Sequence, residues 1–308
     1  PDITVDGIHL DGISATSVIS HNNAGSRFEL RNSRITNISG TFLQVSNTTD
    51  WRFTGNYLAD ISGYGFRLHG GTPVRVHIED NVMRGVVIPV QLIGSQGGVV
   101  SGNDMDGMTA EGIITAIQVA NSSNVVVRDN VVRNARLGVM LDRNNANVEI
   151  SCNDIEAAAY GVRAMDYIPP GVQTMRILHN RIISPADMST TWATGETFVV
   201  GSNYYGGGEA TTMAVNGATV AVADALSANP VGNPLCGINT AHSIVAYAGT
   251  GTQSTPVVTA FTDLRARVQD ELGGAVMGVE VAFSDPSSST AAGATLGTLV
   301  GNTDLNGE

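Results

Sequence analysis

The sequence predicts an all-β protein in which about nine short coils stack on one another as a parallel β-helix. An apolar-x-apolar-x-x-Asn-x-apolar phrase returns about every 25 residues, its apolar and polar positions alternate, and Gly and Asn residues separate the copies. Alternation is the period of a β-strand. Repetition at a fixed period is typical of stacked-repeat folds, in which each copy forms one coil and equivalent positions lie above one another.

One turn residue marks each copy, and in seven of the nine copies it is Asn. The turn residues, spaced by 22 to 27 positions, are Asp6, Ser33, Asn56, Asn81, Asn103, Asn130, Asn153, Asn180 and Asn203. Asn tolerates the left-handed backbone conformation, and its side chain can hydrogen-bond to the backbone of a tight turn. Stacked Asn side chains can also bond to one another. We therefore expect this residue to form one corner of every coil.

Each copy from the second onward contains a further predicted strand, an apolar-x-apolar trio after a small residue. Its first and third side chains should point into the core and its middle one outward. The outward column predicted in this way consists of Gln44, Arg67, Gln91, Gln118, Met140 and Arg163. Any binding function of the coils is expected on this column.

The composition excludes some functions. The formal net charge is −12, and all sixteen basic residues are Arg. An acidic surface repels the phosphate backbone, so we expect no nucleic-acid partner. No stretch approaches the ~20 apolar residues of a transmembrane helix. The absence of Lys removes this residue as a base, a nucleophile or a substrate clamp.

Two cysteines leave two alternatives open. Cys152 precedes the turn residue of the seventh copy, and Cys236 lies beyond the last copy. They form a disulfide, as expected of an extracellular protein, or they are independent buried thiols. Two cysteines alone cannot supply the four ligands of a structural zinc site.

The end of the repeats resembles a known family. Asn203-Tyr204-Tyr205-Gly206 is similar to the Asn-Trp-Trp-Gly signature near the end of bacterial right-handed parallel β-helix repeat proteins, of the pectate-lyase-like superfamily. The resemblance implies a right-handed helix and a terminal cap that closes the core. We therefore expect a first domain over residues 1–240.

The remaining residues resemble a second family. Residues 264–284, followed by Gly293-Ala294-Thr295-Leu296 and the segment 303–308, are similar to bacterial immunoglobulin-like domains of the invasin type. The resemblance implies a partial C-terminal Ig-like β-sandwich over residues 241–308, incomplete at its C-terminus. Such domains are spacers in surface and secreted proteins, which implies an extracellular or cell-surface location.

The predicted outward face contains candidate catalytic residues. Glycoside hydrolysis needs two carboxylates about 5 to 9.5 Å apart, and Asp142 and Asp166 lie about one coil apart in the sequence. They are candidates for acid and nucleophile, with Arg67 and Arg163 holding a uronate carboxylate. The alternative, which the sequence favours, is that these are surface charges and that Arg163 pairs with Asp142.

Binding by the same face is expected to use Arg67, His69, Gln91, Gln118 and Arg163. The resemblance to the β-helix family does not add catalytic residues, because its Asp-Pro-His-Glu, Asp-Asp and Gly-His-Gly motifs are absent. Asp104 and Asp106 offer oxygen ligands for calcium, but the other ligands of a calcium loop are missing, and a simple turn is favoured. No cofactor is therefore expected.

The sequence favours a secreted or cell-surface structural or adhesive protein, in which a rigid β-helix is joined to an Ig-like spacer. The alternative is a module that binds or degrades a polysaccharide on the outward face, as a lyase, an epimerase or a glycosidase. A polysaccharide or neighbouring copies of the same protein are the expected partners.

Overall fold

The structure is a computed structural model of the 308-residue chain. It describes residues 3–21, 25–71, 73–109, 112–165, 174–190, 197–201, 203–205, 212–215, 218–221, 243–248, 265–269, 280–282 and 300–302. The chain divides into two compact units, Pro1–Cys236 and Gly237–Glu308.

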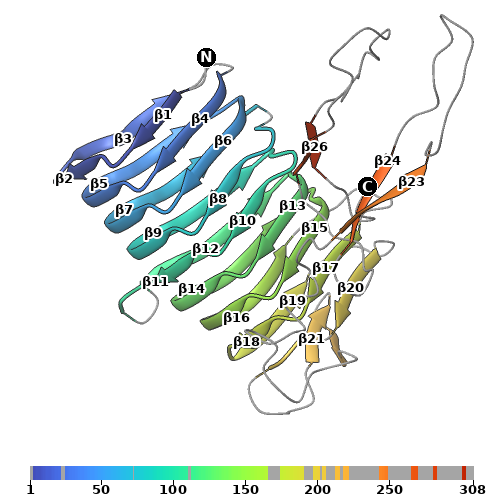
Figure 1. The fold of residues 1–308 in the computed structure, drawn as a ribbon. Coiled ribbons are helices and arrows are strands. Elements are labelled where there is room, and N and C mark those ends of the chain that lie inside the picture. The colour runs from blue at the N-terminus through green and yellow to red at the C-terminus, as the bar shows by residue number, and fades with distance from the viewer. Residues whose placement is uncertain are drawn as a thin grey trace, which may run out of the picture. The chain divides into compact units, whose positions relative to one another are not determined.

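Parallel strands build the first unit, and each strand pairs with its equivalent in the next coil (Figure 1). The first sheet has nine strands. In spatial order they are β1 (Ile3–Asp6), β4 (Gly25–Arg31), β6 (Thr48–Thr54), β8 (His77–Glu79), β10 (Val99–Ser101), β13 (Ser123–Arg128), β15 (Ala146–Ser151), β17 (Thr174–Leu178) and β20 (Thr197–Gly201).

A second sheet follows the turn in each coil. Its spatial order is β2 (His9–Asp11), β5 (Arg34–Val45), β7 (Tyr57–Leu68), β9 (Val82–Ile93), β11 (Asp104–Asp106), β14 (Val131–Asp142), β16 (Asp154–Met165), β19 (Ala186–Thr190), β21 (Thr212–Val215) and β22 (Ala218–Ala221). Three further strands belong to this sheet. β3 (Ser14–His21) pairs with β5, and β18 (Arg181–Ile183) pairs with β16. β12 (Ile113–Ala120) pairs with both β9 and β14. Of these pairings, only that of β21 with β22 is antiparallel.

The predicted stacked, parallel all-β fold is confirmed, and the described residues contain no helix. Nine complete coils are not confirmed, because the last coils include residues outside the described ranges. The predicted first copy also needs a correction. Ile3 lies opposite Phe28 and Val5 opposite Leu30, so the residue equivalent to Ser33 is Ile8 and not Asp6.

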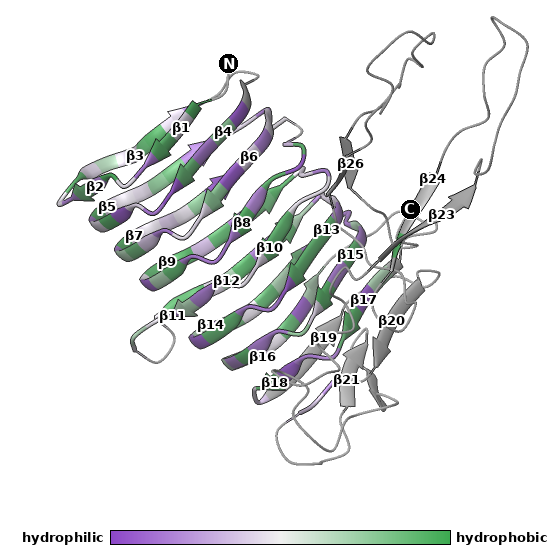
Figure 2. Cartoon of the chain, in the orientation of Figure 1, coloured by the Kyte–Doolittle hydropathy of each residue, from purple (hydrophilic) through white to green (hydrophobic). Residues whose placement is uncertain are grey.

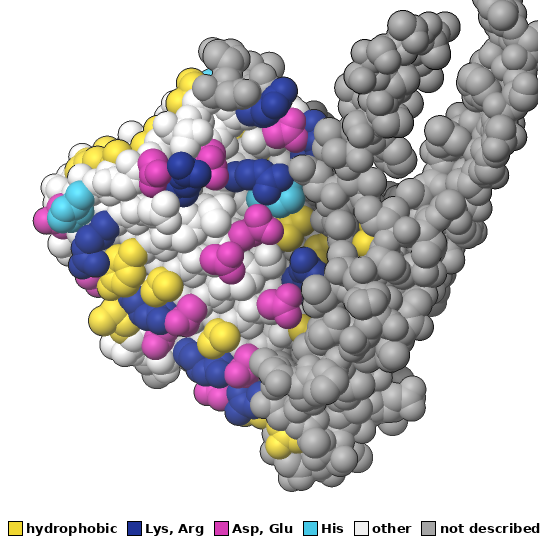
Figure 3. All heavy atoms as spheres, in the orientation of Figure 1, with side chains coloured by type: hydrophobic (Ala, Val, Ile, Leu, Met, Phe, Trp, Pro, Cys, Tyr) yellow, Lys and Arg dark blue, Asp and Glu magenta, His cyan; other side chains and the backbone are white. Residues whose placement is uncertain are grey.

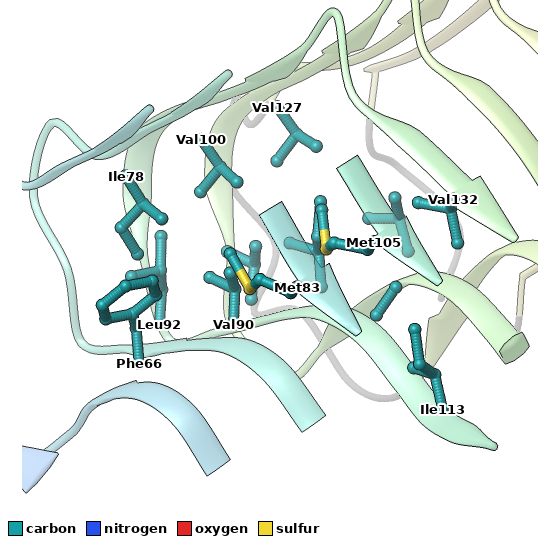
Figure 4. Packing of buried hydrophobic residues seen from close by; sticks show 14 of the residues in the cluster. Phe66, Ile78, Met83, Val90, Leu92, Val100, Met105, Ile113, Val127 and Val132 are labelled. Carbon is teal, nitrogen blue, oxygen red and sulfur yellow. The ribbon is translucent and has the colours of Figure 1, made fainter. Parts of the chain in front are cut away.

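The core is a set of stacked columns, as the alternation predicted. Figure 4 shows Phe66, Val90 and Leu92 pointing inward towards Ile78 and Val100, which come from the other sheet. All five side chains are fully buried. Along the strands hydrophobic and hydrophilic residues alternate (Figure 2). Full burial of one large apolar side chain contributes about 1.5 to 3 kcal/mol, so the columns are the main stabilising feature of the stack.

The turn of each coil divides two tasks between neighbouring residues. The left-handed backbone lies one residue before the expected position, for example at Asp80, Asp129 and Cys152, with φ of 54°, 55° and 54°. The following Asn side chains are buried and form hydrogen bonds. The prediction that the Asn itself takes the left-handed conformation is therefore wrong, whereas the expected side-chain bonding is confirmed.

These Asn side chains form a continuous ladder. In Asn103, Nδ2 donates to Oδ1 of Asn130 at 2.9 Å and the backbone N–H donates to the same oxygen at 3.1 Å. Asn103 Nδ2 also donates to the carbonyl oxygens of Ile78 and Ser101. The coil-to-coil bonds recur from Asn56 to Asn203. Each coil thus satisfies buried polar groups of the coil before it, which fixes the stacking register.

In the second unit the described residues form two antiparallel pairs. They are β23 (Ser243–Ala248) with β24 (Arg265–Gln269) and β25 (Glu280–Ala282) with β26 (Val300–Asn302). Strands β24 and β25 lie within residues 264–284, the segment that resembles the Ig-like domains. These two hairpin-like pairs do not support an Ig-like sandwich, and most residues of the predicted sandwich lie outside the described part of the chain.

Candidate functional site

The outward column of the second sheet exists as predicted, and we call it the glutamine face. It consists of Gln44, Arg67, Gln91, Gln118, Met140 and Arg163, which are neighbours in this order in the strand registers. The residues on either side of each member, such as Phe66 and Leu68 beside Arg67, are fully buried. The six side chains therefore point outward from β5, β7, β9, β12, β14 and β16; Gln91 is only 5% exposed, and the other five are partly exposed.

Hydrogen bonds join the first four members of the glutamine face. Arg67 donates from Nη1 to Oε1 of Gln44 at 3.1 Å and from Nε to Oε1 of Gln91 at 2.9 Å. Gln91 then donates from Nε2 to Oε1 of Gln118 at 2.7 Å. From Arg67 one hydrogen bond runs to the preceding coil, at Gln44, and the others run through Gln91 to Gln118. They end there because the next residue, Met140, has no strong acceptor.

Two tyrosines stack on the arginines of this face. The guanidinium carbon of Arg67 lies 4.6 Å from the ring centre of Tyr64, and that of Arg163 lies 4.8 Å from the ring centre of Tyr160. These distances are within the range of cation–π contacts. Apolar residues continue the tyrosine positions along the strands: Ile88 lies opposite Tyr64, and Leu137 lies opposite Tyr160. Tyr64 and Ile88 therefore lie beside the polar column, as do Leu137 and Tyr160, and the polar Thr115 lies opposite Leu137 on β12.

Sequence reasoning did not find the two tyrosines. The signal is a repeated tetrapeptide, Tyr-Gly-x-Arg, at residues 64–67 and 160–163. Strict alternation places the first and fourth residues of such a segment on opposite faces. In both segments the two middle residues, Gly and its successor, are buried, and the Tyr and Arg at the ends are partly exposed, so the alternation is broken inside the tetrapeptide.

The candidate catalytic pair is not assembled among the described residues. Asp142 lies opposite Met165 on one side and opposite Ala120 on the other. Asp166 itself lies outside the described residues. The pairing of Asp142 with Asp166 therefore stays a prediction.

The favoured alternative for these charges also needs a correction. Asp142 makes its ion pair with Arg143, at 3.9 Å, and not with Arg163. Arg163 lies opposite Met140 and Ser189, two uncharged residues. The ion pair predicted between Asp142 and Arg163 is therefore absent, because their side chains belong to different columns.

The remaining predicted site residues are only partly tested. His69 follows β7, and burial, with a smaller effect of Arg67, lowers its pKa below the ordinary value. Its Nε2 is buried without a hydrogen-bond partner in the described part of the chain. Cys152 is disulfide-bonded. Cys236, its predicted partner, lies outside the described residues, and the pairing stays a prediction.

A charged network that sequence reasoning missed lies near the start of the long strands. Arg133 Nη2 donates to Asp154 Oδ2 at 2.5 Å, and Arg181 Nη1 contacts Asp154 and Glu156 at 2.6 and 2.7 Å. Figure 3 shows basic and acidic side chains intermixed along the lower left edge. Opposite charges in this network neutralise one another, which leaves little charge for an external ligand.

The proposed calcium ligands are engaged by protein groups. Asp104 accepts hydrogen bonds from Arg84 Nη1, and Asp106 accepts them from Asn134 Nδ2 and from the N–H of Met108. In the described ranges no three metal-ligating side chains of the His, Cys, Asp and Glu types gather. Those ranges also contain no helix that is long and apolar enough to span a membrane.

Comparison with known proteins identifies the fold of the first unit. Residues 17–168 match the family model described as the right handed beta helix region. This part of the chain is a right-handed parallel β-helix. No curated protein matches.

Some solved structures are similar to this chain at a low level. DFA-IIIase from Arthrobacter chlorophenolicus A6 in complex with GF2 is 12% identical, with a TM-score of 0.39 over 76% of this chain and 70% of that one. Alginate lyase from Paenibacillus sp. str. FPU-7 is 14% identical, with a TM-score of 0.38 over 66% of this chain and 86% of that one. Similarity at this level does not indicate what the present protein binds.

Proposed function

We propose that this β-helix binds a polysaccharide along the glutamine face. The supporting observation is the pair of tyrosine–arginine stacks in the same two columns, with Gln91 and Gln118 between them. A glycan presents hydroxyl groups at its edges and C–H groups on its ring faces. Amide and guanidinium groups match the hydroxyl groups, whereas tyrosine rings and aliphatic side chains match the C–H faces.

The arrangement of the face suits an extended ligand. Neighbouring coils are about 4.8 Å apart, and Arg67 and Arg163 are separated by three intervening coils. A ligand that contacts both stacks therefore spans about 19 Å along the helix. The hydrogen bonds within the face hold its side chains in place before binding, which lowers the entropy cost of association.

Binding is proposed without catalysis. Cleavage of a glycosidic bond needs an acid and a second carboxylate at a suitable separation. The rung neighbours of Asp142 are Ala120 and Met165, which supply neither. The catalytic candidate Asp142 therefore has no described carboxylate as a rung neighbour.

A structural or adhesive role is the second candidate. The observation that favours it is the unbroken ladder from Asn56 to Asn203, which joins successive coils through buried hydrogen bonds. A stack held in this way suits a rigid spacer. One surface protein can bind a glycan and also act as a spacer. A glycan-binding experiment tests the first role alone.

We further propose a secreted or cell-surface location. The disulfide at Cys152 supports it, because disulfides persist in oxidising compartments. The neighbouring-copy partner predicted from the sequence has no described contact behind it and remains an expectation.

A glycan-binding screen tests the proposal. We expect the protein to retain extended polysaccharides and the double variant Tyr64→Ala/Tyr160→Ala to lose this binding by at least tenfold, because both apolar platforms are removed. Tyr57→Ala is the matched control. Tyr57 also stacks with an arginine, Arg34 at 4.5 Å, but it lies at the start of β7, before the bend at Asp60, and outside the glutamine face. Equal loss in the control, or no retained glycan, would contradict the proposal.

A further inference from the structure

We propose that Arg163 is the ligand-binding cation of the glutamine face, and that it selects polysaccharides carrying carboxylate groups. The inference rests on the proposed glycan binding and names its substrate class. It also separates two arginines that occupy equivalent positions in the sequence. Arg67 maintains the face, and Arg163 contacts the ligand.

Arg67 is already occupied by the protein. It donates one hydrogen bond to Gln44 and one to Gln91, and its guanidinium group stacks on Tyr64. A carboxylate that approached Arg67 would have to replace two of these bonds. Arg67 is therefore a positioning residue, which orients the glutamine side chains on both sides.

Arg163 has the same stacking contact without the hydrogen bonds. Its guanidinium group lies over Tyr160, and its rung neighbours are Met140 and Ser189. Among the described residues it takes part in no ion pair and no side-chain hydrogen bond, although its side chain is only partly exposed. The guanidinium group keeps N–H donors whose fork geometry fits a carboxylate in a bidentate manner.

A second donor lies on the same side of the face. Gln118 accepts from Gln91 through Oε1, so its Nε2 group points its donors away from that bond. No described acceptor takes them, because the next rung holds Met140. Gln118 and Arg163 therefore lie on either side of Met140, two rungs or about 9.6 Å apart. Arg163 can bind the carboxylate of one sugar residue while Gln118 donates a hydrogen bond to an oxygen of a neighbouring sugar residue.

The charge of the remaining surface sharpens this selectivity. The chain carries a formal net charge of −12, so a polyanion is not attracted by the protein as a whole. Two other arginines, Arg133 and Arg181, are neutralised by ion pairs with Asp154 and Glu156. Binding of an acidic glycan then depends on one local contact and should weaken as salt rises.

The test compares two polymers and three proteins by calorimetry or affinity electrophoresis. The polymers are a linear polyuronate and the same polymer after chemical reduction of its carboxyl groups. The proteins are the wild type, Arg163→Gln and the matched variant Arg67→Gln. Thermal unfolding of each variant establishes that the fold is retained.

We expect the wild type to bind the polyuronate roughly tenfold or more tightly than the reduced polymer. Arg163→Gln should lose this preference. It should bind both polymers as weakly as the wild type binds the reduced polymer. Arg67→Gln should weaken binding of both polymers by the same factor, because it disorders the glutamine side chains without removing the carboxylate contact.

Equal binding of both polymers by the wild type would overturn the assignment of Arg163 and leave glycan binding intact. The same conclusion follows if Arg67→Gln, and not Arg163→Gln, abolishes the preference. If neither polymer nor any glycan in the screen binds, the proposed function itself fails.

Discussion

Two neighbouring residues at each corner meet two separate requirements of the stack, a left-handed backbone conformation and a side chain that bonds to the adjacent coils. The residue in the left-handed conformation varies and includes Gly102, Asp129 and Cys152, with φ between 54° and 65°. The next residue is the buried Asn, whose amide group bonds to the adjacent coils. The backbone conformation can be met by several residue types, whereas the bonding pattern needs a side chain that both donates and accepts. This difference explains why the repeated Asn is so visible in the sequence.

Loss of one ladder side chain is expected to destabilise the protein strongly. In Asn130→Ala, the backbone N–H and Nδ2 of Asn103 lose the oxygen that accepts both. Nδ2 keeps the carbonyl oxygens of Ile78 and Ser101 as acceptors, whereas the buried backbone N–H is left without one. One buried donor without a partner costs about 1 to 3 kcal/mol. Urea denaturation of the variant measures this change in the free energy of unfolding.

Asn144→Ala is the control for the ladder variant. Asn144 is exposed, and it makes a long side-chain hydrogen bond of 3.4 Å to Asn121. We expect its effect to stay within about 0.5 kcal/mol. Similar losses in the two variants would show that burial of the amide is not what matters.

At the scale of the strands, contacts between neighbouring coils recur on every face. Asp50 and Arg75 lie on adjacent coils, and Arg75 donates from Nε and Nη2 to the two carboxylate oxygens at 2.5 and 2.9 Å. The hydrogen bond from Arg75 lowers the pKa of Asp50 below its usual value of 3.8, against an opposing effect of burial. The same direction holds for Asp106, whose carboxylate accepts from Asn134 and Met108.

These lowered pKa values predict a loss of stability in acid. A carboxyl group whose pKa is lower in the folded protein stabilises it at pH values above the unfolded pKa, and this contribution disappears as the pH falls through the folded pKa. We expect the melting temperature to fall as the pH decreases below about 4. Asp50→Asn should reduce the slope of this decline, because the group no longer titrates. An unchanged slope in thermal scans between pH 5 and pH 2 would assign the decline to other carboxylates.

At the scale of the whole chain, the two compact units are linked near Cys236, the last residue of the first unit. Cys152 lies at a corner of the β-helix and is disulfide-bonded. If its partner is Cys236, as the sequence predicts, the bond closes a loop of about 84 residues. A disulfide that closes a loop of that length stabilises a protein by about 4 kcal/mol in the chain-entropy model.

Removal of this bond should lower the melting temperature. We expect Cys152→Ser and Cys236→Ser to lower it by similar amounts, and a reducing agent to lower it in the wild type alone. Differential scanning calorimetry with and without the reductant measures these shifts. A free thiol in alkylated wild-type protein, detected by intact mass, would contradict the pairing.

Much of the fold was predictable because its information is local and repeated. The inward residues around Phe66 and Val90, the Asn corners and the outward column from Gln44 to Arg163 follow from periods of two and of about 25 residues. The match of residues 17–168 to the β-helix model agrees with that prediction. The Ig-like sandwich was expected from motif order over a short segment instead of from repetition, and the described residues do not support it.

The sequence by itself determined which side chains face the core and which face solvent, since alternation within each coil requires no knowledge of other coils. The tertiary structure decided which outward residues meet. A break in the alternation places Tyr64 beside Arg67 and Tyr160 beside Arg163, and the strand register places Asp142 opposite Met165. A shift of one residue in the register of a strand changes every neighbour. The candidate site therefore depends on bulges and on coil lengths, which the repeat pattern of the sequence leaves open.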